Sequence, residues 1–589
     1  MRLIIAIGFC LLVSCAAKAQ CTGGPVPPAA FNGVPFNCVT GPTPQPNDLV
    51  LGGSQSQGAL GGNKGTVAWS WSQVFNSPAS SVTANGITNP LATWMGAPGT
   101  FSPMQYGAVG NGTADDTTAV QAALTAAVGG GTVILGDHLY GISSTLIVSK
   151  EKVLGNGGNG RATGGLSGMF FSSGFVGLNA TLQVLNVESD SVIEDIAIKF
   201  SGTQSAGCAI QTGATVEDIQ FHRVVIAAPY NGMCINGNTV STDLAMIVAP
   251  VANGIVIGNL TTGAGTVDPR ITNTDVLGVG TSSGIYVEDA GGLYLENNDI
   301  IFGTYGTVFS PGANQSVQWT FAVNTVLGDT TAQNPLLIDT GAASASIYGL
   351  QFTNTWASNN TNGASIQIQN TGGGAVNSIW FNGHRTFTGG NSAGSSLVTI
   401  LANVKDVSFD SSRLCGYPAS GTGYGINFPN ATAGPISIRN TEISNSCNGY
   451  FSSPGALAAA VNLTGATGAT ITGNDFTGAT VPAVGTPGGI STIAGNRGLD
   501  NFTPTIATSA TLALSNPNPG YYLTGTTTVT NITGVWDNRS VFFITGGGAT
   551  SFNTGGGGTT GICNSVASAG ALSTVTATYN AGLSCWLMK

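Results

Sequence analysis

The chain has 589 residues, and only 7% of them are charged, whereas about 25% is usual for a soluble domain. This scarcity of charge and the 88 glycines disfavour helical and α/β enzymes, because helices carry charge on their wet face and avoid Gly. A hydrophobic content of 42% with a net charge of −10 argues against disorder, and the lack of a three-residue Gly period excludes collagen. An all-β, turn-rich protein remains. Its 16 basic residues form no cluster, so we expect no nucleic-acid partner.

Residues 1–19 have the features of a signal peptide. Arg2 precedes an apolar run from Leu3 to Val13, and Ala17-Lys18-Ala19 offers a cleavage site. The alternative is a lipoprotein signal with its anchor at Cys15, because Leu12-Val13-Ser14-Cys15 resembles a lipobox. We therefore expect a secreted protein or one held at the cell surface. No later run reaches the ~18 apolar residues that a membrane helix needs.

Eight cysteines follow the predicted signal peptide, and they fall into four couples that are close in sequence. An even number of cysteines in an exported protein indicates disulfides rather than free thiols. The sequence does not fix their connectivity, and we expect neighbours to pair. The eight are Cys21, Cys38, Cys208, Cys234, Cys415, Cys447, Cys563 and Cys585.

Residues 20–100 are rich in Pro, Gly and Ser, and we interpret them as an N-terminal attachment segment. The first helical pattern follows at 116–128, where apolar residues recur at helical spacing. Asp115 and Asp116 stand at its start, where carboxylates can cap free N–H groups. Gly129-Gly130-Gly131 ends the helix, and residues 132–135 are predicted to form a strand.

A short unit of the form apolar-x-apolar then recurs to about residue 499, mostly at steps of 23 to 33 residues. A repeat of this length made of short strands without a helix indicates a β-solenoid. Successive coils would stack at about 4.8 Å, and the helix at 116–128 could cap the open end. Units of this form begin at Ile196, Ile219, Leu293, Val317, Leu350, Ile379, Val407 and Ile436.

An Asn follows many of these units and marks what we predict to be the same corner of successive coils. Asn tolerates the left-handed backbone that a sharp corner needs, and stacked Asn side chains can bond in a ladder. Stacked like charges repel, which accounts for the low charge of the chain. The predicted corner residues are Asn273, Asn297, Asn324, Asn354, Asn382, Asp410, Asn440 and Asn474.

The run from Tyr106-Gly107-Ala108-Val109-Gly110 through Asp115-Asp116-Thr117 to Gly130-Gly131-Thr132-Val133 resembles the opening of the pectate-lyase superfamily. More narrowly, it is similar to the rhamnogalacturonase/epimerase-like pectate lyase domain, which phage tailspikes also use. The resemblance implies that residues 101–499 form a right-handed single-stranded parallel β-helix with a polysaccharide ligand. It does not fix the reaction, because one fold hosts many functions.

Residues 501–589 alternate Thr with apolar residues around Gly-rich turns, and we predict a small β-sandwich-like module. This module is similar to those that end tail-fibre proteins, a likeness that implies a homotrimer.

The predicted corners align surface positions in a column, two residues past each corner. The column contains Asp275, Asp299, Val326, Trp356, His384, Ser412, Glu442 and Phe476. Asp275 and Asp299 would be one coil, about 5 Å, apart. Paired carboxylates can act as acid and as nucleophile or base in glycoside hydrolysis, with like-charge repulsion raising the pKa of one of them. Glu288 and Asp289, on the coil between, could join this catalytic cluster.

Substrate-binding candidates share the same column. Trp356 offers an aromatic face to an apolar sugar face. His384 and Arg385 could bind an acidic sugar or move a proton, and Glu442 lies further along the column. For each of these, and for the acid pair, a structural or solvated role is the competing interpretation.

Asn273-Thr274-Asp275 resembles the Asn-Thr-Asp motif of polygalacturonase-like hydrolases, which implies a catalytic Asp275, and Gly383-His384 resembles part of their Gly-His-Gly motif. However, Arg385 replaces the last Gly, and the expected Asp-Asp and Arg-Ile-Lys motifs do not occur. A calcium-dependent lyase is the other option, with ligands drawn from the carboxylates between Asp275 and Asp299 and with Arg270 as the nearest basic group. No cofactor is certain, and any metal ligands are unknown.

The sequence thus predicts an exported β-helix that binds and can cleave an extracellular polysaccharide as a glycosidase or lyase. The alternatives are a non-catalytic, tailspike-like adhesin that recognises a receptor, and a purely structural surface protein.

Overall fold

The computed structural model describes part of the chain. The described residues are 81–84, 87–90, 99–159, 170–258, 265–358, 360–391, 395–401, 403–418, 421–430, 434–446, 455–489, 491–499, 505–514, 517–546, 550–555, 560–567 and 573–589. The predicted signal peptide and Cys15 lie outside them. The chain divides into two compact units, Met1–Trp94 and Met95–Lys589. In the first, β1 (Ser81–Ala84) pairs antiparallel with β2 (Ile87–Pro90).

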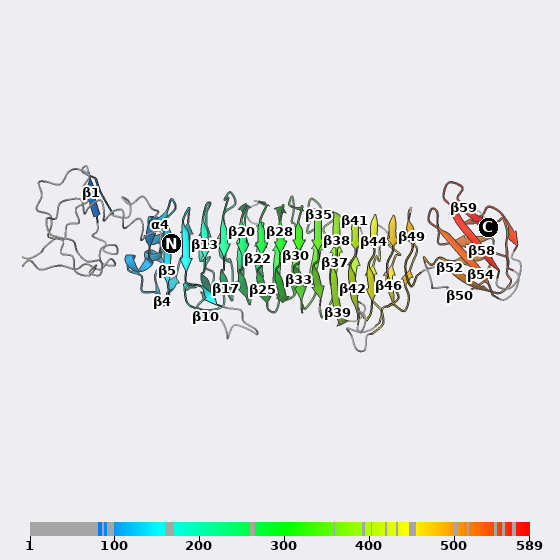
Figure 1. Cartoon of the computed structure of the whole chain (residues 1–589), viewed down its shortest axis with the longest axis horizontal. Coiled ribbons are helices and arrows are strands. Elements are labelled where there is room, and N and C mark those ends of the chain that lie inside the picture. The colour runs from blue at the N-terminus through cyan, green and yellow to red at the C-terminus, as the bar shows by residue number, and fades with distance from the viewer. Residues whose placement is uncertain are drawn as a thin grey trace, which may run out of the picture. The chain divides into compact units, whose positions relative to one another are not determined.

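The second unit contains a right-handed, single-stranded parallel β-helix, as the sequence and the resemblance to the pectate-lyase superfamily predict. Each coil passes in order through three parallel sheets, which we name walls 3, 1 and 2. Figure 1 shows the strands of successive coils side by side from β5 to β49. Short strands suffice because every strand pairs with its equivalents in the coils before and after it.

Wall 1 is a 13-stranded sheet. Its strands are β4 (Asn111–Asp115), β6 (Leu139–Ile142), β11 (Gly174–Gly177), β14 (Ala197–Phe200), β17 (Val225–Ala227), β21 (Met246–Val248), β25 (Asp275–Gly278), β29 (Asp299–Phe302), β33 (Val326–Asp329), β36 (Trp356–Ser358), β39 (Arg385–Asn391), β42 (Arg413–Pro418) and β45 (Glu442–Ser444).

Wall 2 is a second 13-stranded sheet. Its strands are β7 (Leu146–Val148), β12 (Leu185–Val187), β15 (Cys208–Thr212), β18 (Asn231–Ile235), β22 (Asn253–Ile257), β26 (Ser283–Val287), β30 (Tyr305–Phe309), β34 (Leu336–Asp339), β37 (Ile366–Gln369), β40 (Val398–Ile400), β43 (Tyr424–Asn427), β46 (Ala459–Asn462) and β48 (Ala483–Val484).

Wall 3 bends within several of its coils, so that two short strands or one longer bent strand represent a coil. Its strands are β3 (Thr100–Phe101), β5 (Thr132–Gly136), β8 (Lys152–Gly155), β13 (Val192–Glu194), β16 (Gln220–His222), β19 (Gly237–Asn238), β20 (Ser241–Asp243), β23 (Thr266–Val267), β24 (Arg270–Thr272), β27 (Ala290–Gly291), β28 (Tyr294–Glu296), β31 (Ser316–Gln318), β32 (Phe321–Val323), β35 (Ser346–Thr353), β38 (Ala375–Asn382), β41 (Val404–Asp410), β44 (Ile436–Arg439), β47 (Ala469–Thr472) and β49 (Thr492–Ala494).

The core lies between the walls and is built by stacking like residues on like. Phe352, Phe381 and Phe409 come from three successive strands of wall 3, and their rings stack at centroid distances of 4.8 and 4.6 Å. These spacings match the distance between paired strands. One inward position therefore sets the packing of the same position in the next coil.

The predicted capping helix is confirmed as α4 (Thr117–Ala127), after a short 3-10 helix, η1 (Pro103–Tyr106). Val120, Ala123, Leu124 and Ala127 bury its apolar face. Asp116 stands at the N-cap, but its carboxylate accepts N–H groups from the preceding loop, Val109 at 2.6 Å and Gly110 at 3.1 Å. Asp115, the residue before Asp116, accepts the Thr117 N–H through its Oδ1 atom at 3.1 Å. No helix in the described ranges is long and apolar enough to cross a bilayer.

A two-stranded excursion leaves the β-helix at β9 (Gly158–Asn159) and β10 (Phe170–Phe171). The C-terminal residues form a separate eight-stranded mixed sheet with its own buried core. Its strands are β50 (Thr505–Ala507), β51 (Thr511–Ala513), β52 (Gly520–Thr524), β53 (Asn531–Thr533), β54 (Ser540–Thr545), β56 (Gly561–Ile562), β58 (Thr574–Asn580) and β59 (Cys585–Met588), beside a pair made of β55 (Ser551–Phe552) and β57 (Val566–Ala567).

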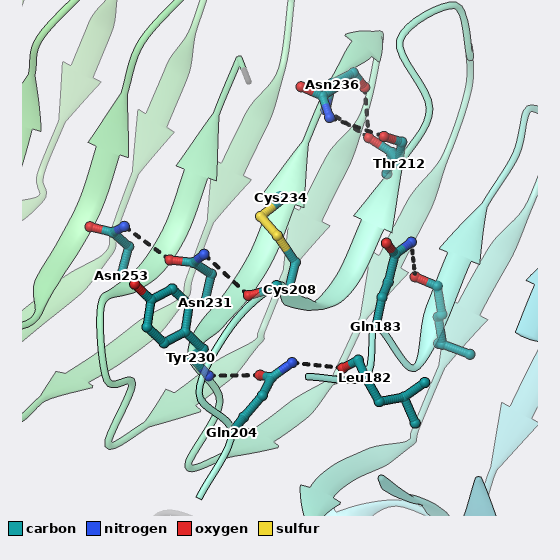
Figure 2. The surroundings of a disulfide bond; sticks show 12 residues. Leu182, Gln183, Gln204, Cys208, Thr212, Tyr230, Asn231, Cys234, Asn236 and Asn253 are labelled. Atoms are coloured by element: carbon teal, nitrogen blue, oxygen red, sulfur yellow. Dashed lines mark hydrogen bonds between the residues drawn. A yellow bond between two sulfur atoms is a disulfide. The ribbon is translucent and has the colours of Figure 1, made fainter. Parts of the chain in front are cut away.

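Two of the predicted neighbour disulfides are present. Cys208 bonds to Cys234 on wall 2, and Cys563 bonds to Cys585 in the C-terminal module. Figure 2 shows the first bond, which links β15 to the next strand, β18. Cys415 is also disulfide-bonded, and its predicted partner Cys447 lies outside the described residues, as do Cys21 and Cys38.

Candidate functional site

The corner between walls 3 and 1 is made by one residue per coil with a left-handed backbone. Asn273, Asn297, Asn324, Asn354 and Asn440 occupy it, with φ between 48° and 54°, as predicted. The predicted amide ladder is present between the first two, where Asn297 Nδ2 donates to Asn273 Oδ1 at 3.3 Å. The corner therefore sets a common register for the positions that follow it.

In three coils the predicted corner was wrong by one residue. Gly383, Ser411 and Gly473 have the left-handed backbone there, in place of Asn382, Asp410 and Asn474. At the two Gly corners the left-handed backbone is readily adopted, because Gly lacks a Cβ atom. The outer column shifts by one residue in the same coils. Its members there are Arg385, Arg413 and Asp475, in place of the predicted His384, Ser412 and Phe476.

Asp275 and Asp299 begin this outer column and are directly paired on the adjacent strands β25 and β29. Both side chains are half-buried. Adjacent strands lie about 4.8 Å apart, so the two carboxylates can approach to the ~5–5.5 Å that a retaining glycosidase uses. The outer column continues from Asp299 to Val326 on β33 and then to Trp356 on β36, each in register with the residue before it.

Trp356 is fixed by contacts that the sequence did not reveal. Its ring stacks on Phe387 at a centroid distance of 4.7 Å, and its Nε1 donates to Ser358 Oγ. Ser358 Oγ in turn donates to Asp329 Oδ1 at 3.2 Å. A third carboxylate therefore joins wall 1 beside the acid pair and the indole. The signal for it was the second outward position of the wall-1 strands, which in β33 lies three residues past the column because the register shifts there.

Charged side chains complete the column. Arg385 is exposed and pairs in register with Trp356. Glu442 lies 2.8 Å from Arg413 in an ion pair (Glu442 Oε2 to Arg413 Nε), and Asp475 forms another with Arg497 at 3.2 Å. Wall 1 thus presents carboxylates, an aromatic ring and guanidinium groups in one line along the β-helix.

His384 does not face this surface. It is fully buried, one residue before Arg385, and its Nδ1 lies 2.7 Å from Thr355 Oγ1. Burial lowers the pKa of His384 to about 3, because the interior penalises the charged imidazolium. A substrate on the surface cannot reach it, so its predicted role in substrate binding is wrong.

Glu288 and Asp289 were expected beside Asp275 and Asp299, but they lie at the corner between walls 2 and 3. Glu288 comes directly after β26, and its equivalents in the next two coils are Ser310, directly after β30, and Asp339, the last residue of β34. Burial raises the pKa of Asp289, and an N–H donated by the next coil opposes the rise. The two acids therefore belong to a different surface from the wall-1 pair.

Tyr286 marks this second surface, which is the outer face of wall 2. Burial raises the pKa of the Tyr286 phenol, a hydrogen bond with Ser310 opposes the rise, and the charges of Glu288 and Asp339 add to it. Tyr286, Ser310 and the two carboxylates thus form a cluster that spans three coils. The carboxylates predicted as calcium ligands are divided between wall 1 (Asp275 and Asp299), the corner between walls 2 and 3 (Glu288 and Asp289) and wall 3 (Glu296). Among the described residues no three His, Cys, Asp or Glu side chains are placed to hold a metal ion.

Comparisons with known proteins were made on the sequence and on the fold. No protein-family model matches the chain, and no curated protein matches it significantly. The structure is similar to the A-module of the Azotobacter vinelandii mannuronan C-5 epimerase AlgE6, with 15% identity, 67% of this chain and 98% of the module covered, and a TM-score of 0.45.

Two phage tailspikes are also similar. The tailspike of E. coli bacteriophage HK620, solved with a pentasaccharide, is 10% identical, with 86% of this chain and 89% of that chain covered and a TM-score of 0.48. Tailspike protein 3 of bacteriophage CBA120 is 13% identical, with 73% and 66% covered and a TM-score of 0.44. Likeness at this level assigns no activity to the chain.

Proposed function

We propose that this protein binds an extracellular polysaccharide along the outer face of wall 1 and hydrolyses it there. The observation that carries the proposal is the direct pairing of Asp275 with Asp299, followed in the same column by Trp356. Disulfides such as Cys208–Cys234 suit an exported protein, which agrees with the signal peptide proposed for residues 1–19.

In the proposed reaction the two carboxyl groups take different roles. One, in its acid form, donates a proton to the leaving glycosidic oxygen, and the other, as a carboxylate, attacks the anomeric carbon. Water then releases the sugar from the covalent intermediate, and the first group accepts the proton of that water. Trp356 supports an apolar sugar face, and Arg385 can bind a carboxylate on an acidic sugar.

The test uses a panel of polysaccharides with two readouts, new reducing ends and the absorbance of unsaturated sugars. We expect reducing ends alone, and Asp275→Asn and Asp299→Asn should each lower the rate by about 10²–10⁴-fold. Asp475→Asn is the matched control, because Asp475 lies in the same column outside the acid pair, where it forms an ion pair with Arg497. Full activity in both pair variants would reject the site, and unsaturated products would indicate a lyase.

A second candidate is a non-catalytic adhesin that recognises a surface glycan as a trimeric spike through residues 501–589. The scarcity of charge supports it, because only 26 Asp and Glu residues are available in the whole chain for acid–base chemistry. Retention on a polysaccharide without any cleavage, together with a trimer mass in light scattering, would favour this candidate over the hydrolase.

A further inference from the structure

Wall 3 carries a row of aromatic side chains on its outer face, away from the acid pair of wall 1. Tyr294, Phe321 and Trp380 alternate with core residues on their strands and therefore point outward. They occupy equivalent positions in register, with Gln351 between the last two. Each is half-buried. The row thus offers ring faces at multiples of the strand spacing along the β-helix axis.

Trp319 lies beside this row, at the bend in the middle of wall 3. Its side chain is 49% exposed and its backbone is left-handed, with φ of 53°. Small or short polar residues hold the equivalent left-handed position in the neighbouring coils, namely Asp268, Gly292, Gly349, Ser378 and Asp406. A bulky residue is strained in this conformation, and strain of this kind collects at functional sites.

The neighbouring coil is shaped to receive the indole. A Cβ atom on Gly349 would lie 2.8 Å from Trp319 Cε3 and 3.2 Å from Cδ2, so only glycine lets the ring rest on this backbone. Tyr348 meets the ring edge-on at a centroid distance of 6.1 Å and an angle of 84°. The ring is therefore fixed over Gly349 while about half of the side chain stays in contact with solvent.

Hydrogen-bonding groups surround the rings, and charge is sparse among them. Gln318 Nε2 donates to Ser316 Oγ at 2.6 Å beside Trp319, and Gln351 lies within the row. Arg270 approaches Tyr294, with its Cζ 6.0 Å from the ring centroid. Rings that pack on apolar sugar faces, with amides and hydroxyls beside them, suit a glycan chain. A stable protein interface uses about 20–30 residues a side, many more than this patch offers.

From these features we propose that the outer face of wall 3 is a second glycan-binding surface, a platform centred on Trp319 with Tyr294, Phe321, Tyr348 and Trp380. This deepens the proposed function, on which it rests for the class of ligand, because the platform holds the polymer and the wall-1 acids cut it. The platform binds extended polysaccharide, and it contributes nothing to the binding of short fragments that occupy wall 1 alone.

The experiment compares retention of the full chain in native gels that contain alginate, polygalacturonate, xylan or dextran. Trp319→Gly removes the ring and suits the left-handed backbone, so the variant should fold at least as well as the parent. Leu244→Gly is the matched control, because Leu244 is also an exposed bulky residue (48%) with a left-handed φ of 53°, but it lies at the corner between walls 3 and 1, outside the platform and the wall-1 column.

We expect Trp319→Gly to lose at least tenfold in affinity for the gel polysaccharide that retains the parent, with Leu244→Gly unchanged. On short oligosaccharides from the same polymer, kcat and KM of Trp319→Gly should equal those of the parent. Equal retention of parent and Trp319→Gly would overturn the platform and leave the proposed function standing.

Other results would also overturn the platform. If no polysaccharide retains the parent, the platform and the proposed function both fail. If light scattering shows an oligomer for the parent and a monomer for Trp319→Gly, the surface binds a second copy of the chain instead of a glycan.

Discussion

The Nδ1 atom of His384 lies 2.7 Å from the Oγ1 atom of Thr355, and both side chains are buried inside the β-helix on successive coils. They belong to an inner column that starts one residue after each corner. In the first coils this column is apolar, with Ile196, Val224 and Ala245. From Thr274 onward it is polar: its members are Thr274, Asn298, Thr325, Thr355, His384, Ser412, Thr441, Asn474 and Asn496.

The first prediction concerns the response of His384 to acid. Its pKa is about 3 in the fold against an ordinary 6.5, so the unfolded chain takes up the proton first. Stability from this group is complete above pH 6.5 and falls as the pH drops toward 3, by about 1.4 kcal/mol per unit inside this window. His384→Asn should flatten the dependence of the melting temperature on pH between 7 and 4. His138→Gln, at a half-buried site, should leave it unchanged, and a parallel loss in His384→Asn and parent would contradict the assignment.

Glu151 should show the opposite dependence on pH. It is buried, and burial raises its pKa to about 7, with the backbone N–H of Ser149 opposing the rise and the charge of Glu188 adding to it. The folded chain therefore binds the proton more tightly, and the stability from this group is present below pH 4.5 and lost as the pH rises toward 7. Glu151→Gln should raise the melting temperature at pH 8 and have little effect at pH 4. Glu217→Gln, at an exposed site, is the control, and a lower melting temperature for Glu151→Gln at pH 8 would contradict the prediction.

The buried amide of Asn474 should contribute more to the free energy of unfolding than a similar amide on the surface. Its Nδ2 donates to Ile438 O and Asn496 Oδ1, both at 2.9 Å, and its Oδ1 accepts the Thr441 N–H at 2.9 Å. Asn474→Ala removes these three buried hydrogen bonds and should cost about 2–4 kcal/mol of unfolding free energy.

Asn231 provides the comparison, because its amide bonds to Asn253 and Gly207 on the outer face of wall 2 (Figure 2). Asn231→Ala should cost less than about 1 kcal/mol, since water can replace its partners. Denaturant unfolding monitored by fluorescence measures both variants, and equal losses would show that burial does not set the difference.

The disulfide between Cys208 and Cys234 should stabilise the neighbouring coils of wall 2. It closes a separation of 26 residues, for which restriction of the unfolded chain gives about 3.5 kcal/mol. Replacing both cysteines by Ser should speed hydrogen exchange in β15 and β18. The same replacement at Cys563 and Cys585 should affect exchange in the C-terminal module alone, and unchanged exchange in β15 and β18 would contradict the prediction.

The sequence predicted the β-helix because its repeat, its turn residues and its lack of charge all point to the same architecture. It predicted the register wherever an Asn forms the corner, as at Asn273 and Asn297, and so paired Asp275 with Asp299 correctly. It failed at Gly383, because an adjacent Asn and a Gly both suit a left-handed turn and spacing alone cannot separate them. Shifting the register by one residue exchanges an outer for an inner position, which is why the prediction for His384 was wrong.

The remaining site features depend on contacts that no repeat pattern encodes. Position in the chain groups Glu288 and Asp289 with Asp275, whereas the wall on which a residue lies depends on how many residues each turn uses. The support of Trp356 by Phe387 and Ser358 needs the register of the neighbouring coils. The repeat pattern predicts Trp319 as the last residue of an inward-facing strand, and the bend that exposes it is visible only in the backbone.

Helix α4 has a consequence for association between molecules. Stacked coils present strand edges at each end, and an open edge is a template on which another chain can add its own strands. By burying Val120, Ala123, Leu124 and Ala127 over the first coil, the helix covers the apolar cross-section that such an addition needs. Strands of another chain therefore cannot be added at this end of the β-helix while the helix stays in place.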